Sequence, residues 1–334
     1  MNLTFQIQAR SFFPSRLLFA GVLFFCSHAG RSQSLQTPPP LPAAAGQSAI
    51  SVKAELVVLP VSVTDTNGNA VGGLSQQNFR VYDDGRLQNI TMFQQGDTPV
   101  TVGLIVDHSR SMGSKLQEVA DAVSSFAQSS NPQDEMFVVD FNDDVSVELL
   151  DGKAFTHDPK ELAKAIYSVR ARGRTALYDA VAEGLIHLKL GHCDRKALII
   201  VSDGGDNASQ QKLSQVLILA QQSQVLIYSI GLIGDSGEVN PAVLRRLAKA
   251  TGGVAYFPDR MNTVTSISEQ IARDLREQYT LGFTPEKVNN THAFRKLEVR
   301  VVAPGRGKFR VRTRSGYFSA EENSSSLQSA KGAK

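Results

Sequence analysis

Acidic and hydroxyl side chains follow apolar stretches of the chain at positions where they could bind a metal ion. These side chains are Asp107, Ser109, Ser111, Thr175 and Asp203. Asp107 comes directly after the apolar run at residues 101–106, and Asp203 comes shortly after the run at residues 197–201. If both runs are strands of one parallel sheet, their carboxyl ends meet at the edge where such sheets bind ligands. We therefore expect the five side chains to lie together.

The chemistry of this set suits a hard divalent cation. Mg²⁺ prefers oxygen ligands at about 2.0–2.1 Å and usually keeps some of its waters, so two carboxylates with three hydroxyls suffice. A position left to water is also open to an oxygen of a ligand. The alternative is that Asp107, Ser109 and Thr175 only cap helices, as Asp, Ser and Thr often do.

The elements that must position these residues alternate between strand and helix. Strands are predicted at residues 101–106, 136–141, 145–149, 197–201, 225–230 and 253–257. Helices with one apolar face are predicted at residues 115–128, 159–169, 175–190, 209–223, 241–250 and 264–278. Near-continuous apolar strands between amphipathic helices are typical of a mostly parallel sheet covered on both faces. The predicted fold class is therefore α/β, with a doubly wound, Rossmann-like sheet.

Two segments with β patterning flank this region. Residues 50–97 and 279–320 each contain too few strands to be stable alone, so we expect them to pair into one small sandwich-like domain. In the second segment Arg310, Arg312 and Arg314 alternate with apolar residues. They are expected to form a solvated edge face, and polyanion binding is the alternative.

The N-terminus indicates export. Arg10 and Arg16 precede a short apolar run at residues 17–25, and small residues follow it at a suitable cleavage site. We predict a secreted, periplasmic or cell-envelope protein without a transmembrane segment after signal cleavage. The predicted organisation is a signal peptide at 1–29, a disordered linker at 30–49, a β segment at 50–97, the α/β domain at 98–278, a β segment at 279–320 and a disordered tail at 321–334.

The motif residues resemble those of the von Willebrand factor A family. That family has a metal-ion-dependent adhesion site built from D-x-S-x-S, then a threonine, then an aspartate. Asp107, Ser109 and Ser111 match the first part with its spacing intact, and Thr175 and Asp203 match the second and third parts. The resemblance covers residues 100–278, and the flanks resemble those of secreted proteins of this family that are frequent in acidobacteria.

The resemblance implies a role for each residue. Ser109 and Ser111 would bind the metal directly, Thr175 would do so in the ligand-bound state, and Asp107 and Asp203 would act largely through water. The implied cofactor is Mg²⁺, with Mn²⁺ or Ca²⁺ as alternatives. The implied function is a binding or adhesion module, not an enzyme, whose partner is a protein with an exposed Asp or Glu. The alternatives are a structural envelope scaffold with an unused metal site and a metal-assisted hydrolase.

Other patterns point less clearly to chemistry. The net charge of +3 is too small to indicate nucleic-acid binding. A zinc site could be suggested by His187, His192, Cys193 and Asp194, but they straddle a predicted helix end and no second ligand pair stands nearby. Residues 142–144 favour a hairpin turn over a second metal site. His108, at an x position of the motif, is expected to point away from the metal.

Overall fold

The computed structural model describes residues 56–318, except for 148, 150–151, 233–239 and 287–293. The predicted signal peptide, linker and C-terminal tail lie outside these described residues. Within them, no helix is both long enough and apolar enough to cross a membrane.

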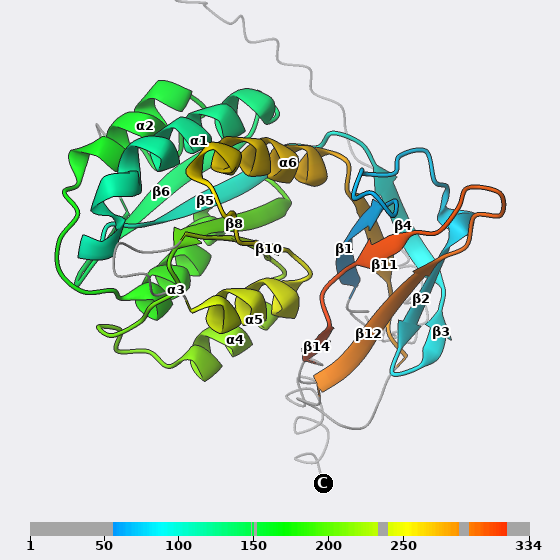
Figure 1. Ribbon diagram of the computed structural model, residues 1–334. Coiled ribbons are helices and arrows are strands. Elements are labelled where there is room, and N and C mark those ends of the chain that lie inside the picture. The colour runs from blue at the N-terminus through cyan, green and yellow to red at the C-terminus, as the bar shows by residue number, and fades with distance from the viewer. Residues whose placement is uncertain (1–55, 148, 150–151, 233–239, 287–293, 319–334) are drawn as a thin grey trace, which may run out of the picture. The chain divides into compact units, whose positions relative to one another are not determined.

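A six-stranded sheet forms the centre of the α/β part (Figure 1). Its strand order is β10-β9-β8-β5-β6-β7, and every neighbouring pair is parallel except β6 with β7. The strands are β5 (Val100–Asp107), β6 (Glu135–Phe141), β7 (Val145–Val147), β8 (Arg195–Ser202), β9 (Leu226–Gly231) and β10 (Ala255–Tyr256). This order confirms the predicted doubly wound, mostly parallel sheet.

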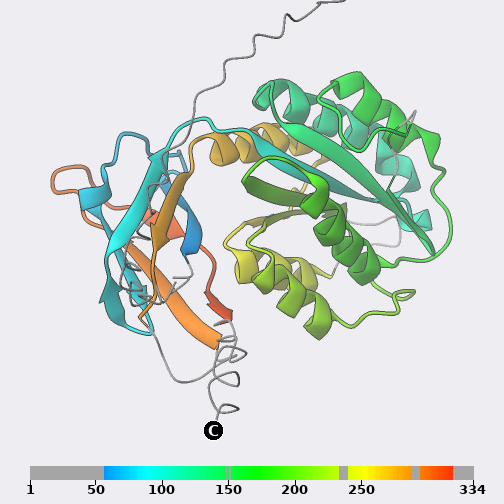
Figure 2. The ribbon, with the colours of Figure 1, turned by 180° about the vertical axis from the view of Figure 1, so that it is seen from behind.

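Helices cover both faces of this sheet (Figures 1 and 2). One layer contains α1 (Leu116–Ser129), α2 (Pro159–Ser168) and α6 (Val264–Arg276), and the other contains α3 (Leu177–His187), α4 (Leu213–Gln222) and α5 (Pro241–Thr251). All eight residues of β5 are buried because helices pack on both of its faces. Short 3₁₀ turns adjoin helices at Arg110–Lys115, Leu188–Leu190 and Met261–Thr263, and another at Gln76–Asn78 leads into the strand that begins at Phe79.

The helix predicted at residues 209–223 begins only at Leu213. Side chains hold the preceding residues in a loop against the start of α3. The Ser209 hydroxyl accepts a hydrogen bond from the Tyr178 N–H at 3.0 Å and donates one to Asp206 at 2.5 Å. These bonds compete with helical hydrogen bonding, as Ser and Asp side chains commonly do at helix starts.

The two flanks form two antiparallel sheets, as the fold prediction requires. One sheet has the order β13-β1-β11-β4 and the other β14-β12-β2-β3, so each combines strands from both ends of the chain. The strands are β1 (Val57–Thr64), β2 (Phe79–Asp83), β3 (Arg86–Gln88), β4 (Ile90–Gln95), β11 (Tyr279–Phe283), β12 (Phe294–Val301), β13 (Arg310–Arg312) and β14 (Gly316–Phe318). Their inward side chains share one apolar core, which includes Leu59, Phe79 and Tyr279.

The expectation of a solvated arginine face is wrong for two of its three residues. Arg310 is exposed, but Arg312 donates to both carboxylate oxygens of Asp274 at 2.9 and 2.8 Å. Arg314 is buried and donates to the Val58 carbonyl at 3.1 Å. The acidic partner comes from α6, far away in the sequence, so the strand pattern alone could not reveal it.

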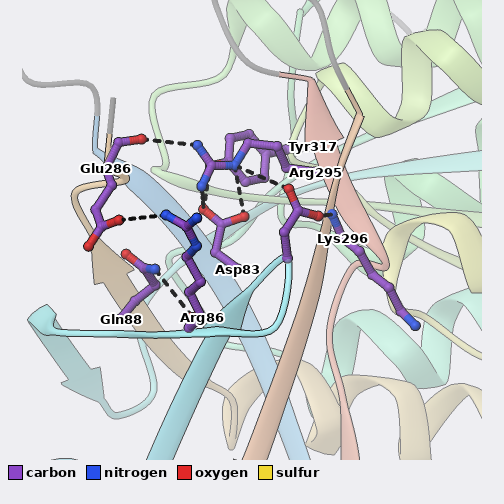
Figure 3. Close-up of polar contacts among 8 residues, drawn as sticks. Asp83, Arg86, Gln88, Glu286, Arg295, Lys296 and Tyr317 are labelled. Carbon is purple, nitrogen blue, oxygen red and sulfur yellow. Dashed lines mark hydrogen bonds and ion pairs between the residues drawn. The ribbon is translucent and has the colours of Figure 1, made fainter. Parts of the chain in front are cut away.

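A buried ion pair joins the strands of the second sheet (Figure 3). Arg295 on β12 contacts both oxygens of Asp83 on β2, with Nε–Oδ1 at 2.9 Å and Nη2–Oδ2 at 2.6 Å. The Tyr317 hydroxyl on β14 donates to the same carboxylate at 2.9 Å. Three strands are thereby connected through one carboxylate.

Candidate functional site

Asp107 ends β5 at the carboxyl edge of the parallel sheet. Its side chain is fully buried, and its Oδ1 accepts the Ser109 N–H at 2.8 Å while its Oδ2 accepts the Ser202 hydroxyl at 2.6 Å. Burial, with a smaller contribution from the nearby Asp203 charge, raises the pKa of Asp107 to about 6 despite these hydrogen bonds. The carboxylate is therefore held firmly in a place where its negative charge is poorly solvated.

Ser109, Ser111 and Asp203 form a chain of oxygen atoms beside Asp107. The two serine hydroxyl oxygens lie 3.1 Å apart, and the Ser111 hydroxyl donates to Asp203 Oδ2 at 2.7 Å. Ser109 and Asp203 are buried, whereas Ser111 is half-buried. The structure thus brings four of the five predicted residues together at one edge of the sheet.

The loop after β8 gives Asp203 its orientation. Gly204 has a φ of +79°, and a Cβ at this position would lie 2.6 Å from the Asn240 carbonyl oxygen, so glycine is required for both reasons. Asp203 Oδ1 accepts the Gly205 N–H at 2.9 Å, which leaves Oδ2 to the hydroxyl chain. Ser202 accepts the Gly204 N–H at 2.9 Å while donating to Asp107, so it connects this loop to β5.

Thr175 lies against the same loop through its backbone. Its N–H donates to Asn207 Oδ1 at 2.9 Å, and its carbonyl accepts the N–H groups of Asn207 and Ala208 at 2.9 and 3.1 Å. The side chain is buried, but among the described residues no hydrogen bond joins its hydroxyl to the other four. The structure therefore fixes the backbone of Thr175 next to the set without bonding its hydroxyl into it.

His108 points away from the oxygen donors, as expected. Its fully buried ring lies 2.9 Å from the Ile166 carbonyl through Nε2 and 3.2 Å from Asp140 through Nδ1. Burial lowers the pKa of His108. This ring helps to attach α2 to the sheet and does not face the Asp107 and Asp203 carboxylates.

The composition of this set fits a hard cation. Asp107 and Asp203 are buried, and among the described residues no lysine or arginine forms an ion pair with either of them. An isolated buried carboxylate is costly unless a cation compensates it. No cluster of three or more His, Cys, Asp or Glu in the described part of the chain has a metal-binding arrangement, so any cation here would depend on the hydroxyls.

Sequence reasoning missed Ser202 and Asn207, which position Asp107 and Thr175. Both lie in the segment VSDGGDN around Asp203, and the density of polar residues there was the available signal. The residues suggestive of zinc do not converge: His187 contacts the Ala154 carbonyl, while His192 pairs with Glu135.

The prediction of a hairpin at residues 142–144 is confirmed. β6 and β7 pair across this turn, and the Asn142 side chain accepts the Asp144 N–H at 3.1 Å. Asp143 at its tip binds the Arg174 guanidinium at 2.7 Å and the Arg174 N–H at 3.0 Å. The turn therefore supports the Thr175 loop.

Several solved structures are similar to this chain. BatB from Bacteroides thetaiotaomicron has 16% identity and a TM-score of 0.43, covering 52% of this chain and 98% of its own. A von Willebrand factor type A protein from Catenulispora acidiphila has 12% identity and a TM-score of 0.49, covering 75% of each chain. Proximal thread matrix protein 1 from the mussel byssus, with a zinc-occupied MIDAS motif, has 16% identity and a TM-score of 0.46. The match covers 59% of this chain and 50% of the mussel protein.

The comparison with curated proteins found no match. A sequence model of the von Willebrand factor type A domain, however, matches residues 102–270, which is just over half of the chain. These residues include all five oxygen donors and nearly the whole parallel sheet with its helices. The chain belongs to the von Willebrand factor type A domain family.

Proposed function

We propose that this protein is a metal-dependent binding or adhesion module that holds a carboxylate of a partner protein. The proposed cation is Mg²⁺, with Mn²⁺ or Ca²⁺ as alternatives, and the proposed ligands are Asp107, Ser109, Ser111, Thr175 and Asp203. The observation that carries the proposal is the pair of buried carboxylates for which the described part of the chain supplies no basic partner. Hydroxyls join them at the carboxyl edge of the sheet.

Each residue has a physical role in this proposal. Ser202 and the Ser109 N–H keep the Asp107 carboxylate in one orientation, so little ordering is needed when a cation binds. The Gly205 N–H does the same for Asp203. Ser111 is the half-buried member of the set and lies nearest to solvent. A bound divalent cation would supply the positive charge that a partner carboxylate needs.

For the hydrolase alternative, His108 is not placed to act as the general base. Metal-assisted hydrolysis needs a group within hydrogen-bond reach of the attacking water. His108 is the histidine nearest to the set in sequence, and both of its ring nitrogens are directed to Ile166 and Asp140 instead. We therefore propose a binding function rather than catalysis, and we propose that the partner is met outside the cytoplasm after export through residues 1–29.

Calorimetric titration of the metal tests the site. We expect Asp203→Ala, and the double variant Ser109→Ala/Ser111→Ala, to reduce Mg²⁺ affinity at least about 10-fold, since each removes oxygen ligands or their orientation. Ser223→Ala is the matched control, because it removes a hydroxyl at the end of α4 that donates to the Ala220 carbonyl and makes no hydrogen bond to the set. Circular dichroism should show that all variants stay folded, and unchanged Mg²⁺ affinity would refute the metal assignment.

Capture of a partner from envelope extracts tests the function. Binding should require Mg²⁺, disappear with EDTA, and disappear when carboxylates on the extract proteins are amidated. Equal capture in all three conditions would remove the support for carboxylate binding. Capture that survives in the Asp203→Ala variant would favour the scaffold alternative, in which the site is not used.

A further inference from the structure

Two exposed arginines lie next to the proposed metal ligands and lack an acidic partner among the described residues. Arg110 stands between Ser109 and Ser111 at the start of the 3₁₀ turn Arg110–Lys115. Arg172 comes from the loop before α3, and its N–H donates to the His108 carbonyl at 2.9 Å, between Asp107 and Ser109. Both side chains are exposed, and no ion pair or hydrogen bond of either guanidinium is found within the described part of the chain.

The two loops that carry these arginines are packed together. A Cβ added to Gly113 would lie 3.4 Å from the Ala171 Cβ, an ordinary van der Waals contact. The hydrogen bond from the Arg172 N–H to His108 fixes the second loop against the first one. Arg110 and Arg172 are therefore anchored at their backbones on the same edge as the oxygen donors, while their side chains remain free to reach a ligand.

The third arginine of this edge is already neutralised. Arg174 donates from Nε to Asp143 Oδ1 at 2.7 Å, and its N–H binds the other carboxylate oxygen at 3.0 Å. Gly173 allows this close approach, because a Cβ there would lie 1.8 Å from Asp143 Oδ2 and its φ is +74°. Arg174 thus serves to shape the loop. Arg110 and Arg172 are the exposed arginines next to the oxygen donors in sequence or through a backbone hydrogen bond, and the exposed Arg170 lies two residues before Arg172 on the same loop.

A count of charges defines the ligand. A divalent cation would balance the Asp107 and Asp203 carboxylates, and Arg110 with Arg172 would add two positive charges that form no ion pair among the described residues. A ligand with one carboxylate would neutralise only part of this charge. Arginine pairs with carboxylates through two parallel hydrogen bonds, which adds geometric selectivity to the attraction.

Resting on the proposed function, we propose that the partner is an acidic peptide segment with at least two carboxylates. One would occupy the metal site, and the other would bind Arg110 and Arg172. On the neighbouring hairpin, the Asp143–Arg174 pair adds no net charge and the exposed Asp144 adds a negative one, so the positive surface is short. An extended polyanion such as an acidic polysaccharide would need a longer basic track, so a short acidic segment fits better.

The test compares two fluorescein-labelled glycine–serine peptides of equal length, one with a single Glu and one with two Glu residues three positions apart. Fluorescence polarisation is measured with the full chain at 150 mM salt, in Mg²⁺ and in EDTA. We expect the two-acid peptide to bind at least about 5-fold more tightly in Mg²⁺, because charge-assisted pairs are strong even when partly exposed. In the double variant Arg110→Gln/Arg172→Gln this advantage should vanish, while the one-acid affinity changes less than about 2-fold.

The matched control is Lys160→Gln/Lys164→Gln, which removes two exposed positive charges from α2 and should leave the advantage intact. Equal affinity of both peptides for the unmodified chain in Mg²⁺ would overturn this inference and leave the proposed function standing. Loss of all Mg²⁺ dependence would instead overturn the proposed function. Stronger competition by polygalacturonate than by the two-acid peptide, at equal carboxylate concentration, would overturn the peptide assignment.

Discussion

The α/β part and the β part of the chain both bury aspartates on strands, but the negative charges have different hydrogen-bonding and ion-pair partners. In the β part, Asp83 is paired with Arg295 at 2.6 and 2.9 Å, and both side chains are buried. At the end of β5, Asp107 is equally buried, but its partners are a backbone N–H and a serine hydroxyl. One carboxylate has a cation built into the protein, and the other has none among the residues that the structure describes.

This difference separates a structural ion pair from a candidate binding site. A carboxylate with its own arginine gains little from an external cation, which would have to displace the pair. A buried carboxylate without one is destabilised by its poor solvation, as the raised pKa of Asp107 reflects. Binding a cation relieves this destabilisation, so the cost of burying Asp107 is consistent with a binding role.

The largest expected effect comes from breaking the built-in pair. Asp83→Asn leaves the buried Arg295 with only the more distant Asp84, 3.8 Å from its Nε and 52% exposed, as a counter-charge, and should destabilise the protein by about 3 kcal/mol. Urea unfolding followed by circular dichroism measures the change. The double variant Asp83→Leu/Arg295→Met should recover most of the loss because it removes both charges. A loss below about 1 kcal/mol for the single variant would show that the pair contributes little.

The comparison also shows what the sequence could predict. The alternation of apolar strands and helices predicts the parallel sheet because that pattern is local. The spacing of Asp107, Ser109 and Ser111 predicts a shared edge because all three follow one strand. The pairings of Asp83 with Arg295 and of Arg312 with Asp274 join residues 212 and 38 positions apart, and no local pattern encodes them. Ser202 and Asn207 were missed because their partners, Asp107 and Thr175, lie far away in the sequence.

A third buried carboxylate, Asp134, extends the comparison to pH. Its oxygens accept the N–H groups of Val100 at 2.7 Å and Asn131 at 3.2 Å, yet burial outweighs these bonds and raises its pKa to about 6. The folded state therefore holds a proton between about pH 4 and 6 that the unfolded state has released. Stability should fall as pH rises through this window, by on the order of 2 kcal/mol for this group.

Urea unfolding at several pH values between 4 and 7, without metal, measures the slope of the unfolding free energy against pH. The slope should be smaller in Asp134→Asn than in the unmodified chain, because the amide does not titrate. Slopes are compared rather than absolute stabilities, since the amide also loses the acceptor for the Asn131 N–H. A slope that is identical in both proteins would mean that Asp134 is ionised normally.

A smaller effect is expected for Asp107, the buried carboxylate at the edge of the parallel sheet. Asp107→Asn removes a poorly solvated charge, so the metal-free protein should become more stable by ~1 kcal/mol, opposite in sign to Asp83→Asn. Mg²⁺ should raise the melting temperature of the unmodified chain and leave that of the variant unchanged, because only a bound ligand stabilises the folded state. A strong loss of stability in metal-free Asp107→Asn would contradict the comparison.

The smallest effect is expected for an exposed ion pair near Asp83. Its side chains carry the same charges as the Asp83–Arg295 pair but are not buried. Arg86 and Glu286 form an ion pair at 3.2 Å whose side chains are 73% and 67% exposed (Figure 3). Water and salt screen such a pair, and ordering two long side chains costs entropy, so its net contribution is close to zero. Arg86→Gln should leave the urea midpoint unchanged within error, at low and high salt alike. A loss comparable to that of Asp83→Asn would mean that proximity of charges, and not their burial, decides which pairs hold the β part together.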